Sequence, residues 1–185
     1  MDEDIRRLQM IAERFSKIGS QPKLEQLEVL PIVNSAIDYM RVRTSNKVAY
    51  SLEVKGDKLE ARAMLCAPLF EWVIENICKN AIDSMEGKGS ITIVMQITSL
   101  KDARKLRYWT TPLRDGNKLI IDIIDTGKGI DRRNFKRIFQ PGYTSKKRGW
   151  GLGLSLGKRI IEDYHGGKLF VKQSQLGIGT TFRIV

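Results

Sequence analysis

Residues 119–130 decide the fold, and they read Leu-Ile-Ile-Asp-Ile-Ile-Asp-Thr-Gly-Lys-Gly-Ile. Five of the first seven positions are apolar, and they fall on both faces of a strand, as is typical at the centre of a sheet. Asp125 therefore ends a buried strand, and Gly127 and Gly129 follow it directly. A carboxylate accepts hydrogen bonds and suits the exocyclic amine of adenine, while glycines let the backbone approach the base. A plain Asp-Thr-Gly turn would not explain a charge at the edge of the core.

Upstream, a helix carries Asn76 and Asn80 among apolar residues. Asparagine is a poor helix former, so two of them one turn apart suggest a function. Asp83 continues the same stripe. Amide oxygens can complete the shell of an Mg²⁺ ion that bridges phosphates, although a solvated polar face would give the same pattern.

Downstream, Gly149, Gly151 and Gly153 precede another helix. Backbone amides at the amino terminus of a helix bind phosphate well, and the glycines there have no Cβ. The preceding residues Lys146, Lys147 and Arg148 add positive charge that would neutralise a triphosphate. The spacing is neither that of a P-loop nor that of a dinucleotide-binding fingerprint, so both of those folds are disfavoured.

Apolar spacing and turn residues predict the other elements. Helices are expected over residues 3–18, from Pro31 to about Arg43, from Pro68 to about Met85, near 132–139 and at about 152–164. Strands are expected at 47–54 and 58–65 around the Gly56-Asp57 turn, and at 90–98, 118–125, 168–174 and 180–185. This order indicates a mixed α/β layer arrangement. Residues 99–117 form a basic, weakly patterned stretch that predicts an exposed insertion.

The helix over residues 3–18 is amphipathic and too short to be stable alone. It either packs on a partner or on its own copy, as the end of a truncated bundle would, or it folds back on this domain. The sequence leaves both possibilities open.

Composition allows one domain and excludes few functions. The chain has 185 residues, 42% of them hydrophobic, and a net charge of +11 that would suit nucleic acid, an anionic membrane or a polyphosphate. It contains no long apolar span and no secretory leader, so we expect a soluble, cytoplasmic chain, which is still compatible with its being the cytoplasmic portion of a membrane-bound protein. The two cysteines, Cys66 and Cys78, are expected to be buried thiols. The single histidine, His165, ends a helix and is expected to be structural.

Together these motifs resemble those of the ATP-binding domain of sensor histidine kinases, within the superfamily shared with type II topoisomerases and the large heat-shock chaperones. The resemblance covers about residues 25–185. It includes an N box (residues 76–81), a first glycine box (125–130), an F box that leads into an ATP lid (135–146), and two further glycine boxes (149–154 and 177–182). The implied fold is an α+β two-layer sandwich of the Bergerat type, with a mixed sheet covered on one face by helices.

The resemblance also implies roles for individual residues. It assigns Mg²⁺ to Asn80 and Asn76, and catalysis to these two residues and Lys146. It implies an ATP site made of Lys79, Asn80, Asp83, Asp125, Gly127, Gly129, Ile130, Phe139, Tyr143, Thr144, Ser145, Lys146, Lys147, Gly149, Gly151, Leu152, Gly153, Leu154 and Thr180.

One position distinguishes the kinases from the ATPases of this superfamily. The ATPases carry a glutamate one turn before the Mg²⁺-binding asparagine, where it activates water. Asn76 occupies that position here, and Glu75 should point about 100° away from it. An amide cannot accept the proton, so we expect slow hydrolysis.

Residues 1–24 contain no histidine, and only the end of a dimerisation helix and a linker are expected there. The implied partners are a histidine-bearing dimerisation domain of the same full-length protein and a response regulator. A homodimer is expected at full length, and a monomer or weak dimer for this chain.

Two alternatives remain. One is an ATPase of the same superfamily or a serine kinase of the anti-sigma-factor type, which steady phosphate release would support. The other is a non-catalytic nucleic-acid-binding or scaffold module, which steeply salt-dependent binding would support. The kinase reading predicts no nucleic-acid partner.

Overall fold

The computed structural model of the chain describes residues 22–55, 61–99, 117–144 and 150–185, with the backbone alone at residues 98, 99, 117 and 118. The elements are, in order, β1 (Glu25–Glu28), α2 (Val29–Arg43), β2 (Val48–Lys55), β3 (Arg62–Leu65), α3 (Ala67–Ser84), β4 (Gly89–Ser99), β5 (Asn117–Asp125), η3 (Arg132–Asn134), η4 (Arg137–Phe139), α5 (Gly153–Arg159), η5 (Ile160–Tyr164), β6 (Leu169–Gln175) and β7 (Gly179–Ile184). The predicted helix over residues 3–18 lies outside the described residues, as does the predicted insertion except for its first and last residues.

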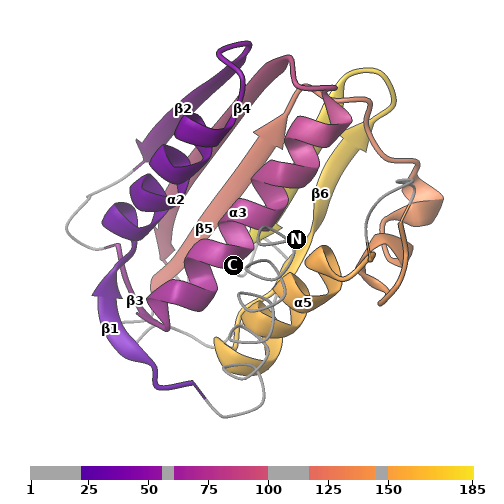
Figure 1. The fold of residues 1–185 in the computed structure, drawn as a ribbon. Helices are drawn as coiled ribbons and strands as arrows, with labels where there is room; N and C mark the ends of the chain where they lie inside the picture. Colours follow the sequence, from indigo (N-terminus) through magenta and orange to yellow (C-terminus); the bar gives the residue numbers. More distant parts are fainter. Residues whose placement is uncertain (1–21, 56–60, 100–116, 145–149) are drawn as a thin grey trace, which may run out of the picture.

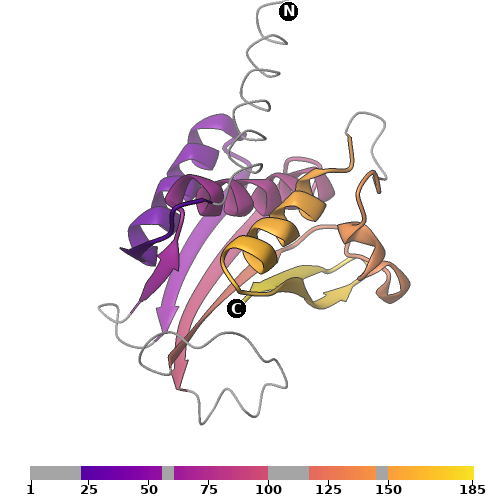
Figure 2. The ribbon, with the colours of Figure 1, turned by 90° about the horizontal axis from the view of Figure 1, so that it is seen from below.

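Five strands form one mixed sheet in the order β2-β4-β5-β7-β6 (Figure 1). β2 runs parallel to β4, and the other neighbours are antiparallel. β5 takes the central place that its apolar sequence predicts. Seen from below, the three longer helices all lie on one face of this sheet (Figure 2). The predicted two-layer α+β class, with a mixed sheet covered on one face, is confirmed.

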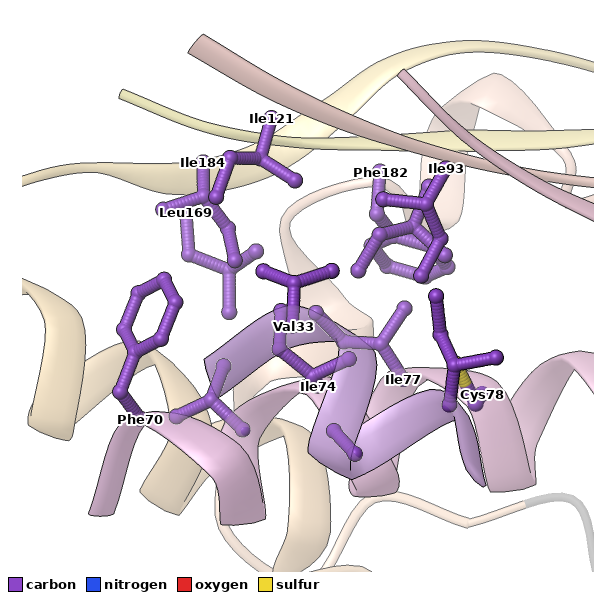
Figure 3. Packing of buried hydrophobic residues seen from close by; sticks show 14 of the residues in the cluster. Val33, Phe70, Ile74, Ile77, Cys78, Ile93, Ile121, Leu169, Phe182 and Ile184 are labelled. Carbon is purple, nitrogen blue, oxygen red and sulfur yellow. The ribbon is translucent and has the colours of Figure 1, made fainter. Parts of the chain in front are cut away.

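The core lies between the helices and this sheet. The buried residues of α3 recur at the helical spacing, from Leu69 and Phe70 to Cys78 and Ala81. Ile74 and Ile77 meet strand residues such as Ile93, and α2 adds Val33 to the same cluster (Figure 3). Burial of this apolar surface is the main force that holds the two layers together.

The strand near residues 58–65 was predicted to follow its neighbour around the Gly56-Asp57 turn, and that pairing is wrong. β3 pairs with β1 in a separate two-stranded sheet, and β2 pairs with β4 along its whole length. Parallel pairing requires a crossover, and β3 and α3 lie between the two strands in sequence. β1 was not predicted. It has only four residues, mostly exposed, and carries no clear period.

Two predicted helices differ in detail. The helix near 132–139 is two separate 3-10 turns, the first capped by Asp131, whose carboxylate accepts from the Arg133 N–H at 2.9 Å. Pro141 limits the second turn, since a residue before proline prefers the extended backbone that Gln140 adopts. The last helix begins as α5 and ends in a π turn.

Candidate nucleotide site

Asp125 lies at the end of β5 and is only 5% exposed. Its Oδ1 accepts hydrogen bonds from the N–H of Gly127 at 2.8 Å and of Thr180 at 3.2 Å, and Ser84 Oγ lies 3.5 Å away. Within the described part of the chain, the hydrogen bonds to this carboxylate all end on Oδ1. Oδ2 is therefore the oxygen with which Asp125 can accept from a ligand.

Burial raises the pKa of Asp125 above its ordinary value, although the hydrogen bonds from Gly127, Thr180 and Ser84 oppose the rise. A buried carboxylate gains most from a donor when water does not compete. The site thus favours a ligand that donates a hydrogen bond to Oδ2.

Gly127 brings the first glycine box against the end of α3. A Cβ at this position would collide with Ser84 Oγ, so a larger residue would push the loop away. The Lys128 N–H also donates to the Ser84 carbonyl at 3.1 Å. The loop is therefore fixed to the helix that carries the two asparagines.

Asn76 and Asn80 lie one turn apart on α3, both half-buried. The Asn76 Nδ2 donates to the Trp72 carbonyl at 2.9 Å, which fixes the direction of the amide. Its Oδ1 would lie 3.0 Å from a Cβ on Gly153, so the amide oxygen faces the start of α5. Lys79 and Asp83 are exposed on the same helix.

A backbone hydrogen bond connects Gly142, near the end of the F box, with Gly151, just before α5. The Gly142 N–H donates to the Gly151 carbonyl at 3.1 Å. Gly151 has a φ of +65°, and a Cβ there would come within 2.8 Å of the Tyr143 nitrogen. Of the predicted site residues here, Phe139, Tyr143, Thr144, Leu152 and Leu154 are described, whereas Ser145, Lys146, Lys147 and Gly149 lie outside the described residues.

Aromatic contacts hold the F box. Phe139 meets Phe182 edge-on at 6.3 Å between ring centroids, and the Lys158 ammonium lies 5.0 Å from the Phe139 centroid. The guanidinium carbon of Arg137 likewise lies 5.4 Å from the centroid of the Tyr143 ring. These contacts connect the F box to β7 and α5.

A comparison with known sequences identifies the family. Residues 67–185, which contain all of these predicted positions, match the family described as "Histidine kinase-, DNA gyrase B-, and HSP90-like ATPase". The chain belongs to this ATPase family.

Its relatives in the ATPase family include sensor kinases. The chain is 34% identical over 161 residues to the sensor kinase CckA of Brucella abortus, which covers 85% of this chain and 16% of that protein. It is 28% identical over 187 residues to sporulation kinase D of Bacillus subtilis, covering 100% of this chain and 33% of that protein. The chain thus spans a third or less of the length of these relatives.

Solved structures agree on the fold. The catalytic domain of the histidine kinase ThkA matches with a TM-score of 0.67 at 22% identity, over 87% of this chain and 93% of that one. ThkA in complex with the response regulator TrrA matches with a TM-score of 0.67 at 20% identity, over 99% of this chain and 48% of that one. The family match and the 34% identical relative confirm the predicted ATP-binding catalytic domain of the histidine kinase type.

His165 has structural contacts in this ATPase-family domain. Its Nε2 accepts from the Cys66 N–H at 3.0 Å, and its Nδ1 lies 2.8 Å from the Ile160 carbonyl, to which it donates. Burial lowers the pKa of His165, against the opposing effect of the Ile160 carbonyl. The neutral ring therefore joins η5 to the start of α3.

The two cysteines differ. Cys78 is fully buried, and burial raises the pKa of its thiol to about 12. Cys66 is only half-buried, so the prediction that both are buried holds for Cys78 alone. In the described part of the chain, no helix is long and apolar enough to cross a membrane.

Sequence reasoning missed three polar residues. Ser84 lies near Asp125, two turns beyond Asn76 on α3, and its helical spacing could have revealed it. Ser174 contacts Ile130 and Thr180, but no signal in the sequence predicts on which face of the sheet its side chain lies. Asp122 is paired with Arg183 across the strands, which only the register reveals.

Proposed function

We propose that this chain binds ATP with Mg²⁺ and, within a full-length sensor kinase, passes the γ-phosphate to a histidine on a helical domain outside this chain. The observation that carries the proposal is the arrangement at Asp125. Its Oδ1 is held by the Gly127 and Thr180 amides, which leaves Oδ2 to accept from a ligand donor. Adenine supplies such a donor in its exocyclic amine.

The polar groups around the site suit the rest of the nucleotide. The amide oxygens of Asn76 and Asn80 are hard donors of the kind that Mg²⁺ takes beside its waters. Mg²⁺, when bound, neutralises charge on the phosphates. Lys146 and Lys147 supply further positive charge, and the Gly151–Gly153 backbone can approach the phosphates closely.

Asn76 favours phosphoryl transfer over hydrolysis. Its Nδ2 is committed to the Trp72 carbonyl, and an amide oxygen cannot take a proton from water. Catalysis then rests on positioning and electrostatics, as is usual in phosphoryl transfer. ATP would persist in the site until a histidine reaches the γ-phosphate.

The partners follow from this role. We propose a histidine-bearing helical domain of the same full-length protein, which forms a homodimer in the cytoplasm, and a response regulator that receives the phosphate. We further propose that residues 1–24 lead from that helical domain, with residues 25–185 as the ATP-binding unit. Sensor kinases among the relatives support this view, as does the likeness in fold to ThkA, which has been solved with a response regulator. No nucleic acid is expected.

The test has two parts. Titration of the chain with a non-hydrolysable ATP analogue in magnesium buffer should give saturable one-to-one binding. The full-length protein, given ATP labelled in the γ-phosphate, should acquire an acid-labile label that Asn80→Ala removes. Absence of binding, or a label that survives Asn80→Ala, would overturn the proposal.

A further inference from the structure

β6 contains a bulge next to the nucleotide site. Val171 pairs with Phe182, but the next pair is Gln173 with Thr181, so Lys172 is an extra residue on β6. In an unbroken register Ser174 would lie opposite Gly179 and face away from the helices. The bulge places Ser174 opposite Thr180 instead, on the side of the sheet where Asp125 lies.

Ser174 contacts three parts of the site at once. Its Oγ accepts from the Ile130 N–H at 2.7 Å, at the end of the first glycine box. It lies 3.0 Å from the Gly179 carbonyl and 2.9 Å from Thr180 Oγ1. The Thr180 N–H in turn donates to Asp125 Oδ1. Ser174 therefore joins the glycine box to the residue that holds Asp125.

The protons can be assigned from the number of partners. A serine hydroxyl has one proton to donate and two lone pairs. The Gly179 carbonyl can only accept, so Ser174 donates to it. One lone pair takes the Ile130 N–H, and the other takes the Thr180 hydroxyl proton. In this arrangement Thr180 Oγ1 has only lone pairs left for a ligand.

We propose that Ser174 is a positioning residue that fixes the Thr180 hydroxyl as an acceptor toward the nucleobase. The inference rests on the proposed function, in which Asp125 and Thr180 line the adenine site. Two acceptors, Asp125 Oδ2 and Thr180 Oγ1, then face the base. Adenine presents an amine there, whereas hypoxanthine presents a carbonyl, which two acceptors reject.

Without the Ser174 hydroxyl, the Thr180 proton loses its acceptor and the Ile130 N–H loses its partner. The Thr180 hydroxyl can then rotate and donate to a carbonyl. Affinity for adenine nucleotides should fall, while affinity for inosine nucleotides should stay or rise. Loss of one such hydrogen bond corresponds to a change of about tenfold.

The test is calorimetric titration of the chain with non-hydrolysable ATP and ITP analogues in magnesium buffer. Ser174→Ala should lower the ratio of the two affinities about tenfold, and Ser174→Thr, which keeps a hydroxyl, should restore it. Ser51→Ala is the matched control, because Ser51 makes a similar 2.9 Å bond to Thr92 Oγ1 on the exposed side of the sheet. It should leave the ratio unchanged.

A double-mutant cycle separates positioning from a general structural effect. If Ser174 acts through Thr180, Ser174→Ala should change the ratio no further in a Thr180→Val background. Equal effects in both backgrounds would overturn the inference, as would a wild-type ratio in Ser174→Ala. Should the alanine variant fail to fold, Ser174→Cys takes its place. Cysteine has a similar volume but forms only weak hydrogen bonds, so the same loss in the affinity ratio is expected.

Asp125→Asn distinguishes this inference from the proposed function. If Asp125→Asn retains affinity for the ATP analogue, the proposed adenine site fails, and the inference fails with it. If Asp125→Asn abolishes binding while Ser174→Ala keeps the wild-type ratio, the inference alone is overturned.

Discussion

Asp125 is a buried titratable residue and His165 a half-buried one, and the hydrogen bonds of each side chain favour one of its charge states. Asp125 accepts from backbone amides, and His165 accepts at Nε2 while it donates at Nδ1. Burial opposes the charged form in both cases, so it raises the pKa of Asp125 and lowers the pKa of His165. Their substitution should therefore affect different properties, ligand binding for one and pH-dependent stability for the other.

Asp125→Asn should lower affinity for the ATP analogue more than tenfold, because an amide nitrogen at the Oδ2 position would face the adenine amine and a hydrogen bond to a charged group is worth about 1.5–3 kcal/mol. The free energy of unfolding should not fall, because the amide oxygen can still accept from Gly127 and Thr180 and a buried charge is removed. Titration calorimetry measures the affinity, and chemical denaturation of the same preparation measures the free energy of unfolding. A loss of stability equal to the loss of affinity would contradict the assignment.

The chain should lose stability as the pH falls below about 6.5, the ordinary pKa of histidine. The folded-state pKa of His165 is lowered, so the unfolded chain binds the proton first, and the loss is complete once the pH is below the folded-state pKa. His165→Gln keeps an acceptor that does not titrate. Denaturation at pH 7.5, 6.5 and 5.5 should show a slope in the wild type that this variant lacks. Equal slopes in the two proteins would show that groups other than His165 cause the pH dependence of stability.

At the scale of the elements, an ion-pair network joins β5, β6 and β7 on the sheet face away from the helices. Asp122 Oδ2 lies 2.7 Å from Arg183 Nη2 and 2.9 Å from Lys172 Nζ, and Asp122 Oδ1 also pairs with the Arg183 Nε. Burial would raise the pKa of Asp122, but the bonds from Arg183 and Lys172 outweigh it and hold the pKa below its ordinary value. Removal of one partner leaves a poorly compensated charge between strands.

Arg183→Met should lower the free energy of unfolding by about 3 kcal/mol at pH 7. The difference from wild type should shrink as the pH falls below 3.8, because the pair contributes only while Asp122 is ionised. Arg133→Ala is the control, since Arg133 makes a similar pair with Asp131 but its side chain is 89% exposed. That variant should unfold at the wild-type denaturant midpoint. Equal losses in the two variants would contradict the role assigned to burial.

Local sequence predicted the elements that carry their own period. The apolar spacing of α3 was sufficient to predict a helix that carries Asn76 and Asn80. The apolar run of β5 was sufficient to predict a strand that ends at Asp125. The partner of β2 was not predictable, because β4 lies beyond β3 and α3 and no local turn indicates it. Ser174 was missed for a similar reason, since its face depends on a bulge. Register and strand order are long-range properties, which a single sequence shows poorly.

At the scale of the whole molecule, helices and sheet form one core, and the first glycine box begins at Asp125, where the central strand ends. The one histidine of the chain is His165, and both of its ring nitrogens are hydrogen-bonded within the fold. Asn76 cannot act as a base. The chain by itself thus lacks both an accessible phosphoacceptor histidine and a general base at this position.

The isolated chain, incubated with Mg²⁺ and ATP, should release phosphate at the rate of buffer alone and acquire no acid-labile label. Addition of the histidine-bearing domain of the full-length protein should produce label on that domain. A coupled phosphate assay and gel autoradiography measure the two outcomes. Steady phosphate release by the chain would instead favour the ATPase reading, and label on the chain would show that His165 is accessible.

The strand order has a consequence for biosynthesis. β7, the last strand along the chain, lies between β5 and β6 inside the sheet. All of β7, up to Ile184, must therefore emerge from the ribosome before the sheet can form completely. Until then β5 has an unpaired edge, and an exposed edge of apolar strand invites aggregation. The nascent chain should depend on chaperones up to that point, and deletion of β7 would open the interior of the sheet.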